Sequence, residues 1–546
     1  MATSRSSTNA PARETNPWAV LVVLCTAVFM LLLDTTIVNV AQRKIQLGLD
    51  ANFSQIQWVM DAYILAFAVL LLTFGRLGDI FGRRLLFAIG LVVFTASSAL
   101  CAASSGLGDV FGISGANALI ISRVIQGIGG ALMMPQSLSM LTVVFPAEKR
   151  GAALGIWGSI VALGAVIGPV LGGYIVTNFA WEWVFIINIP VGIAAVIGTI
   201  RLVPESTDPN ASRSIDWGGV LLSGAGIFAL VYALIEGPRR GWTDSLILGL
   251  FVASAVLMVA FVIWEIRYRD PIMKLELFRI RNFWVANVLG AIISFGVMGM
   301  LFPLSAFLQV ALGFSPIRSG LATVPIAASM MLLAPFVGRL SEKYGPRWFL
   351  VTGYALMTVG VATTIMQISL HTDWQHLFLP MVITGIGMSF SFPPMTTMAL
   401  RQVPPRIAGS ASGMINTTRN IGQVLGIAVL GSVLQSRMAA DGKSQLAGVG
   451  IDQGTRDQII DLAKSNRFDE VVKVIPADQQ QLIPQLLNAL QHTFADAVQT
   501  TLWVAVAVTA VGAVVALAVK NPVRQPVTQA NPTPEGEKAA PVFVLE

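Results

Sequence analysis

The amino-acid sequence predicts an all-α polytopic membrane protein with about fourteen transmembrane helices, arranged as two six-helix bundles plus two inserted helices. First, the 546 residues are 55% hydrophobic and only 12% charged, which leaves too little polar surface for soluble domains. Second, apolar stretches of roughly 20 residues recur along the chain, and each is long enough as a helix to cross a hydrocarbon core of about 30 Å. Third, two pairs of segments repeat each other, which indicates a duplicated unit.

The apolar windows mark the expected spans and the topology. They lie near 18–40, 56–75, 85–104, 116–141, 151–176, 184–202, 217–236, 246–266, 285–311, 317–339, 348–370, 375–398, 410–435 and 497–520. With the N-terminus inside, the cytoplasmic segments carry most of the Lys and Arg residues, as the positive-inside rule requires. We therefore expect a multi-pass protein of the plasma or inner membrane with both termini in the cytoplasm. The net charge of +6 is interpreted as this topology signal and not as nucleic-acid binding.

The duplication is visible in two internal matches. The decapeptide GRLGDIFGRR after the second expected span matches GRLSEKYGPR after the tenth, with Asp79 opposite Glu342. Similarly, the span that begins at Gly151 aligns without gaps on the span that begins at Gly409. The simplest arrangement is six spans, two inserted spans and six more spans, which is a two-half architecture used by many secondary transporters. We expect a central cavity between the halves.

These matches divide the chain into five parts. They are a cytoplasmic N-terminal segment (1–17), an N-terminal six-helix bundle (18–202), two inserted linker helices with a cytoplasmic loop (203–284), a C-terminal six-helix bundle (285–520) and a disordered cytoplasmic tail (521–546).

The long external segment within the C-terminal bundle, 436–496, is polar and has helical apolar spacing. We interpret it as a surface helical hairpin. The alternative interpretation is a docking site for a partner protein.

Three ionisable residues fall inside the expected spans, where a charge is expensive enough to suggest function. Asp34, Asp61 and Arg123 are all predicted to lie at one depth below the external surface. A buried carboxylate beside a guanidinium can be protonated when the cavity opens to one side of the membrane and ionised when it opens to the other. Proton coupling requires such a change. The alternative for Asp34 and Arg123 is a permanent pair that only fastens helices. For Asp61 there are two interpretations: it is solvated or caps a helix, or it attracts a cationic substrate.

The loop after the second expected span is a candidate inner gate. Gly75 and Gly82 permit a tight turn, and Asp79 can accept hydrogen bonds at a helix N-terminus. Arg83 and Arg84 add positive charge on the inner side. Such a turn could lock the halves together in one state; the alternative is a topology signal alone.

The segment GAVIGPVLGG in the fifth expected span has glycines at helical spacing. Gly164, Gly168 and Gly172 share one stripe and Gly173 follows, while Pro169 removes a backbone hydrogen bond. Such glycines admit close helix packing and the proline allows a bend. Ordinary tight packing is the alternative.

Several further residues are candidates for lining a substrate cavity. They are Asp61, Trp58, Gln126, Phe295, Met298, Phe302, Gln309, Asn416 and Arg419. Flexible Met and aromatic surfaces can repack around varied ligands, although each such residue can equally belong to the core or face lipid. For Asn416 and Arg419, cavity lining and a structural interhelical bond both remain open.

No motif for catalysis, metal binding or ATP binding is recognised in the sequence. There is no GxxxxGK[ST] phosphate loop, no Ser/His/Asp, Cys/His or HExxH arrangement, and both cysteines lie in apolar runs. We therefore expect no enzyme activity and no cofactor or metal, with a proton gradient as the energy source. The expected partners are the lipid bilayer, protons and a small-molecule substrate.

At these residues the chain resembles the major facilitator superfamily, specifically its fourteen-span drug:proton antiporter branch. GRLGDIFGRR resembles the loop signature, LIISRVIQGIGGA the span-4 signature with Arg123 in the proton-coupling position, and GAVIGPVLGG the antiporter signature. LDTTIVNVA, QWVMDAYILAFA and NTTRNIGQVLGIAVLG are similar to patterns of that branch. Two departures stand out: Glu182 replaces an expected basic residue, and Gln42 and Arg43 replace an expected Leu-Pro pair.

The resemblance implies a major facilitator fold and proton-coupled efflux of small lipophilic, often cationic, drugs by alternating access. An exporter of an endogenous metabolite, peptide or siderophore, or an importer, would use the same fold. A third interpretation is a membrane sensor or scaffold whose 436–496 segment binds a partner.

Overall fold

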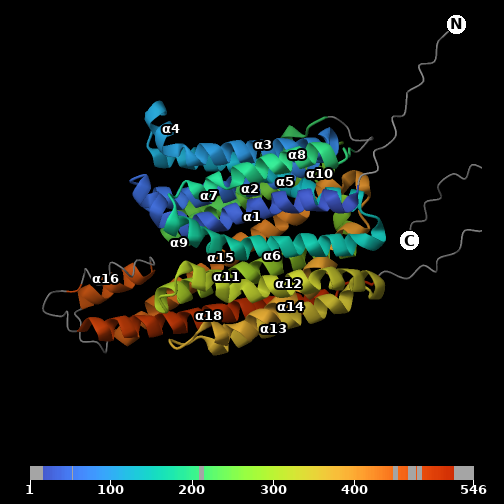
Figure 1. Ribbon diagram of the computed structural model, residues 1–546. Coiled ribbons are helices and arrows are strands. Elements are labelled where there is room, and N and C mark those ends of the chain that lie inside the picture. Colours follow the sequence, from blue (N-terminus) through green and yellow to red (C-terminus); the bar gives the residue numbers. More distant parts are fainter. Residues whose placement is uncertain are drawn as a thin grey trace, which may run out of the picture.

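The computed structural model describes residues 16–51, 53–207, 214–446, 453–464, 475 and 482–521. Within these ranges the chain forms helices and no strand. Most of the long helices run roughly parallel or antiparallel to one another, with the N-terminal helices on one side of the bundle and the C-terminal helices on the other (Figure 1). The start of the first helix and the end of the last lie at the same end of this bundle (Figure 1).

The N-terminal half contains eight helices in the described residues. They are α1 (Pro17–Gly48), α2 (Phe53–Phe81), α3 (Arg83–Ala102), α4 (Ser104–Phe111), α5 (Gly115–Val144), α6 (Ala147–Asn178), α7 (Trp183–Ile186) and α8 (Asn188–Leu202). Side-chain caps fix two of the starts, because Asn16 accepts from the amide of Trp18 and Ser114 accepts from the amide of Asn117.

The inserted pair and the C-terminal half follow. The inserted helices are α9 (Trp217–Arg240) and α10 (Ser245–Arg267), followed by the short η1 (Leu275–Arg279). The C-terminal half contains α11 (Arg281–Ala306), the π-helical η2 (Phe307–Ala311), α12 (Pro316–Tyr344), α13 (Pro346–Gln367), α14 (Trp374–Arg401), η3 (Pro405–Ile407), α15 (Ala408–Leu446), α16 (Gln453–Lys464) and α18 (Ile483–Ala516).

The helices match the predicted spans in order and differ from them in length. Thirteen helices of the described residues are long and apolar enough to cross a membrane, and the remaining predicted span, 151–176, lies within the 32-residue helix α6. The sixth span is broken into α7 and α8, and the ninth ends in the π-helical turn. Helices also continue past the apolar windows, because hydropathy marks the hydrocarbon thickness and not the end of the backbone hydrogen bonding.

The segment 436–496, which is predicted to be external, is helical at both ends. Helix α15 continues to Leu446 and α18 begins at Ile483, so both extend beyond the bundle next to α16 (Figure 1). A groove of about 620 Å³ lies here and is lined by Gln445, Pro484, Gln485, Asn488, Ala489 and His492. The remainder of the predicted hairpin, and the predicted disordered tail beyond Asn521, lie outside the described residues.

The two halves meet mainly along two pairs of helices, α2 with α15 and α6 with α12, and α5 with α15 and α6 with α14 also touch. Glycines bring the backbones together: a Cβ atom on Gly75 would lie 2.9 Å from the Cα of Gly413, and one on Gly151 would lie 2.6 Å from the carbonyl oxygen of Gly338. We call these contacts the glycine seam. Because the repeat relates α2 to α12 and α6 to α15, the two parts of the seam are equivalent positions of the duplication.

The inserted helices pack against the side of the bundle at the junction of the halves. Helix α9 contacts both α2 and α15, and Trp58 of α2 lies 5.8 Å from the ring of Tyr232. At the α9–α10 turn, the indole of Trp242 donates to the hydroxyl of Ser432 on α15 at 2.7 Å. Helix α10 packs mainly on α9 and exposes much of its apolar surface, as expected of a helix that faces lipid.

Candidate functional site

A fully buried cluster of polar side chains surrounds Asp34 in the N-terminal half. Arg123 of α5 donates to Asp34 Oδ2 at 2.5 Å, and Gln126, one turn further along α5, donates to Oδ1 at 2.9 Å. Asn188, the first residue of α8, donates to the same Oδ1 at 2.8 Å. Three helices therefore converge on a single carboxylate that is 0% exposed.

Further contacts hold Arg123 and Gln126 in place. Arg123 donates its Nε to the carbonyl of Val59 at 3.1 Å, and its guanidinium lies 4.2 Å from the ring centroid of Tyr63. Gln126 accepts from Arg123 at 2.6 Å and donates to Ser98 at 2.8 Å. A buried ion pair is tolerated only when its remaining hydrogen-bonding groups are satisfied, and this cluster supplies most of those partners.

Asp61 lies in the same half of the molecule as Asp34. It belongs to α2, two residues before Tyr63, and its side chain is half-buried. The contacts described for Asp34 come from Arg123, Gln126 and Asn188 and do not include Asp61. The predicted joint action of Asp61 with the pair remains a prediction.

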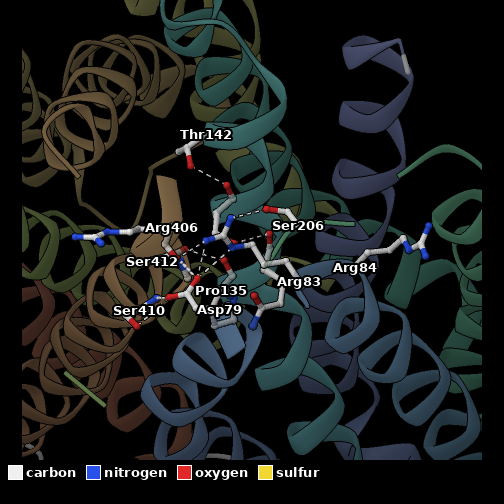
Figure 2. Close-up of polar contacts among 12 residues, drawn as sticks. Asp79, Arg83, Arg84, Pro135, Thr142, Ser206, Arg406, Ser410 and Ser412 are labelled. Atoms are coloured by element: carbon white, nitrogen blue, oxygen red, sulfur yellow. Dashed lines mark hydrogen bonds and ion pairs between the residues drawn. The ribbon is translucent and has the colours of Figure 1, made fainter. Parts of the chain in front are cut away.

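At the other end of α2, Asp79 joins the two halves (Figure 2). Its carboxylate accepts the backbone amides of Gly409 and Ser410, each at 2.8 Å, at the N-terminus of α15. It also accepts from the hydroxyl of Ser410 at 3.0 Å and from Arg83 at 2.7 Å. A negative charge here is favoured because the first amides of a helix lack intrahelical partners and carry the positive end of the dipole.

Arg83 extends this network along both halves. Its guanidinium donates to the hydroxyl of Ser206 at 2.8 Å and to the carbonyl of Arg406 at 3.1 Å (Figure 2). Nearby, Ser412 of α15 donates to the carbonyl of Pro135 on α5 at 2.8 Å. We call the contacts of Asp79, Arg83 and Ser410 the Asp79 latch.

The other residues of the predicted gate loop have separate roles. Gly82 adopts a φ of 115°, which permits the turn between α2 and α3 and leaves room for the carboxylate of Glu205. Glu205 accepts the amides of Arg84 and Leu85 at 3.1 and 3.2 Å and so caps α3. Gly75 lies within α2, one helical turn before Asp79, where it forms the seam and not the turn.

The repeat reproduces the latch in the other half. Glu342, which the sequence aligns with Asp79, accepts the amide of Gly151 near the start of α6 at 2.7 Å. Gly345 aligns with Gly82 and also has a positive φ, of 92°. Each half thus sends one carboxylate to a helix of the opposite half.

The glycine stripe of α6 faces α1. A Cβ atom on Gly164 would lie 2.8 Å from Leu32 Cβ, one on Gly168 would overlap the side chain of Thr36, and one on Gly172 would lie 2.9 Å from the side chain of Ile37. The following Gly173 faces Ile317 of α12, and Pro169 lies against Gly320 of the same helix. The two faces of this motif therefore pack α6 on its own half and on the other.

The predicted cavity residues do not converge on one place. Gln126 belongs to the Asp34 cluster, and Trp58 packs on α9. Phe295 and Met298 are partly buried on α11, whereas Phe302 is 47% exposed and Gln309 is also exposed. Asn416 is buried and donates to the carbonyl of Ser412 in its own helix. Arg419 lies over the ring of Phe392 at 4.3 Å.

Sequence reasoning missed several residues that the structure places at these sites. Asn188 is a lone amide in an apolar run, which is a signal that could have marked it. Ser98, Glu205 and Ser206 carry no such signal, because their partners lie far away in the sequence.

The chain is similar to known proteins over most of its length. The family model described as Major Facilitator Superfamily matches residues 23–427. The tetracenomycin C resistance and export protein of Streptomyces glaucescens is 34% identical over 423 residues, which cover 77% of each chain. A riboflavin transporter of Clostridioides difficile is 33% identical over 415 residues, which cover 76% of this chain and 88% of that protein.

A solved structure shows the same fold. It is a proton:xylose symporter of the same superfamily, bound to 6-bromo-6-deoxy-D-glucose, and it superposes with a TM-score of 0.55 at 15% identity over 75% of this chain and 87% of the symporter. The family model and the relatives confirm the expected family and the prediction that the protein is not an enzyme. This multi-pass membrane transporter of small molecules belongs to the major facilitator superfamily.

Proposed function

We propose that this transporter is a proton-driven exporter of small lipophilic compounds, including cationic ones, that works by alternating access in the cytoplasmic membrane with both termini in the cytoplasm. The observation that carries the proposal is the buried carboxylate of Asp34 on α1, held by donors from α5 and α8, so that three helices meet at this group. A group that gains or loses a proton at such a junction changes the contacts of all three helices together. Proton binding and helix movement are then linked.

In this proposal Asp34 receives a proton when its cluster opens to the outside. Protonation removes the ionic attraction for Arg123, which retains the carbonyl of Val59, the amide oxygen of Gln126 and the ring of Tyr63. These remaining contacts still satisfy the buried guanidinium. A buried charge left without any partner would destabilise the protein by about 3–5 kcal/mol. Asp61 adds negative charge nearby on α2 and favours cations.

The Asp79 latch supplies the gate at the other end of the molecule. It is closed in this structure, because Asp79 and Arg83 bond to α15 and to the carbonyl of Arg406. In the proposed cycle the latch and its Glu342 counterpart hold the inner side shut while the protein faces outward, and they release when it faces inward. The export activity in the name of the Streptomyces relative supports the direction of transport.

The test uses purified protein in liposomes under an imposed pH gradient, with ethidium as the transported dye. We expect Asp34→Asn to abolish gradient-driven ethidium transport. The matched control is Asp109→Asn, which changes an exposed carboxylate on α4 and should leave transport unchanged. Ethidium transport by Asp34→Asn that still follows the gradient would remove Asp34 from its role.

A second candidate function is export or import of an endogenous metabolite on the same fold, and the relative named as a riboflavin transporter favours it. Drug-susceptibility profiles of a deletion strain distinguish the two. Hypersensitivity to lipophilic drugs supports drug export, whereas unchanged susceptibility with an altered cellular level of a metabolite supports the alternative.

A further inference from the structure

Arg419 is half-buried, and it differs from the buried arginines Arg83 and Arg123 in having two shielded nitrogens without partners. Its Nε and Nη1 are shielded from solvent and make no hydrogen bond within the described part of the chain. By contrast, Arg123 and Arg83 each make an ion pair with a buried carboxylate. A guanidinium is charged at every physiological pH, so Arg419 cannot avoid this cost by losing its proton.

The surroundings of Arg419 are aromatic and contribute no acceptor that the described residues reveal. The guanidinium lies 4.3 Å from the ring centroid of Phe392 on α14 and 6.0 Å from that of Trp157 on α6. The two rings stack on each other with centroids 6.0 Å apart. Cation–π contacts offset part of the cost of burying the charge but do not replace the missing hydrogen bonds.

The residues that surround Arg419 come from both halves of the transporter. Phe392, Gly290 and Arg419 belong to the C-terminal half, and a Cβ atom on Gly290 would lie 3.0 Å from Arg419 Cγ. Trp157 belongs to the N-terminal half, is 0% exposed, and its Nε1 also has no hydrogen-bond partner in the described residues. The unpartnered groups of Arg419 and Trp157 are therefore all donors, and rocking of the halves would move Trp157 relative to the guanidinium.

We propose that Arg419 binds an acidic group, a carboxylate or another planar oxyanion, of an aromatic substrate whose ring packs against Phe392 and Trp157. The Nε–H and Nη1–H groups lie on different edges of the guanidinium, so an oxyanion beside either edge can accept a charge-assisted hydrogen bond from it. Such a substrate would be an aromatic acid or a zwitterion that carries an acidic group. The inference rests on the proposed export function, which explains how such a substrate would cross the membrane, and it adds the chemical class of the substrate.

The test is equilibrium binding to purified protein in detergent, without any gradient, so that failure of proton coupling does not affect the result. The probes are anthracene-9-carboxylate and its neutral carboxamide, measured by fluorescence anisotropy. We expect the wild type to bind the carboxylate at least about tenfold more tightly than the carboxamide, which corresponds to one good charged contact. Arg419→Gln should remove this preference and leave binding of the carboxamide within about twofold.

Two further variants separate recognition from folding. Arg318→Gln is the matched control, because Arg318 also lies over a phenylalanine ring, at 4.1 Å from Phe314, but is exposed and paired with Asp373; the preference should survive. Arg419→Met should raise the Tm, since it removes a guanidinium with two shielded donors that have no partner. Equal binding of the two probes by the wild type, an unchanged preference in Arg419→Gln, or a lower Tm of Arg419→Met would overturn the proposal.

Discussion

Asp79 and Glu342 occupy equivalent positions of the internal repeat, and each carboxylate accepts backbone amides of a helix in the opposite half. Asp79 reaches the start of α15 and Glu342 reaches the start of α6, which are themselves repeats of one another. The arrangement is a reciprocal exchange of caps across the molecule. Duplication of one such contact explains why both lie at the same end of the bundle.

The double variant Asp79→Asn with Glu342→Gln should open this end. Each substitution converts charge-assisted hydrogen bonds, worth about 1.5–3 kcal/mol apiece, into neutral ones. Opening can be followed with Ser412→Cys, because Ser412 is buried between the halves and the two native cysteines are buried as well. We expect faster labelling of this cysteine by a maleimide in the double variant.

The control for the latch is Arg84→Gln. Arg84 pairs with Glu205 at 3.7 Å in an exposed position, and such pairs contribute about 0–1 kcal/mol. The labelling rate should stay at the wild-type value. Equal labelling of the double variant and the wild type would show that the caps do not hold this end closed.

Gly168→Ala should destabilise the packing of α6 on α1. The new Cβ atom would lie 2.6 Å from the Cβ of Thr36, which is part of a buried helix contact and has little freedom to move. We expect a loss of about 1–3 kcal/mol and a lower Tm. Gly249→Ala is the control: nothing lies within 4 Å of its position on α10, so it should be neutral or stabilising by up to about 1 kcal/mol. A lower Tm in both variants would point to helix flexibility instead of packing.

Asn188→Ala should weaken the Asp34 cluster without touching the ion pair. It removes a hydrogen bond of 2.8 Å to a buried carboxylate, which is worth about 1.5–3 kcal/mol. We expect a lower Tm together with slower proton-driven dye transport in liposomes. Asn178→Ala removes an exposed amide that bonds only within its own helix in the described structure and should change neither quantity. Wild-type transport by Asn188→Ala would exclude Asn188 from the coupling site.

Trp242→Phe tests the attachment of the inserted helices. The change keeps an aromatic ring to stack on Phe251 but removes the 2.7 Å hydrogen bond to Ser432. The expected loss is about 0.5–1.5 kcal/mol, measured by thermal unfolding. Trp217→Phe, at a position that is 66% exposed, should leave the Tm unchanged. An unchanged Tm in both variants would mean that the inserted pair is held by apolar packing alone.

The fold was largely predictable from the sequence because membrane spans obey two simple physical requirements. Each helix must be apolar over the hydrocarbon thickness, and its backbone must satisfy its own hydrogen bonds. The order of the spans and the duplication followed from these requirements and from the match of GRLGDIFGRR with GRLSEKYGPR. The short α4, the break between α7 and α8 and the extension of α15 to Leu446 did not, because hydropathy does not report where a helix bends or continues in water.

The candidate sites were predictable only in part. Asp34 and Arg123 stood out because charges within apolar spans are rare, and Asp79 stood out because it lies in the decapeptide that repeats at Glu342. Their partners Asn188 and Ser410 were not found, since only the folded chain brings α8 to Asp34 and α15 to Asp79. The residues predicted to line the cavity lie at several separate places for the same reason. The sequence shows that a residue is apolar but not whether it faces lipid, core or substrate.

The glycine seam has an energetic consequence for how the transporter changes state. Bare backbones touch where Gly75 meets Gly413 and where Gly151 meets Gly338, so parting them wets few apolar side chains. At these two points the resistance to opening comes mainly from the neighbouring hydrogen bonds of Asp79 and Glu342. Changing the ratio of two conformations from 1:99 to 99:1 requires a free-energy difference of about 5.5 kcal/mol. A few such hydrogen bonds can supply a difference of this size. A proton or ligand shifts the molecule between arrangements when it favours one of them by a comparable free energy.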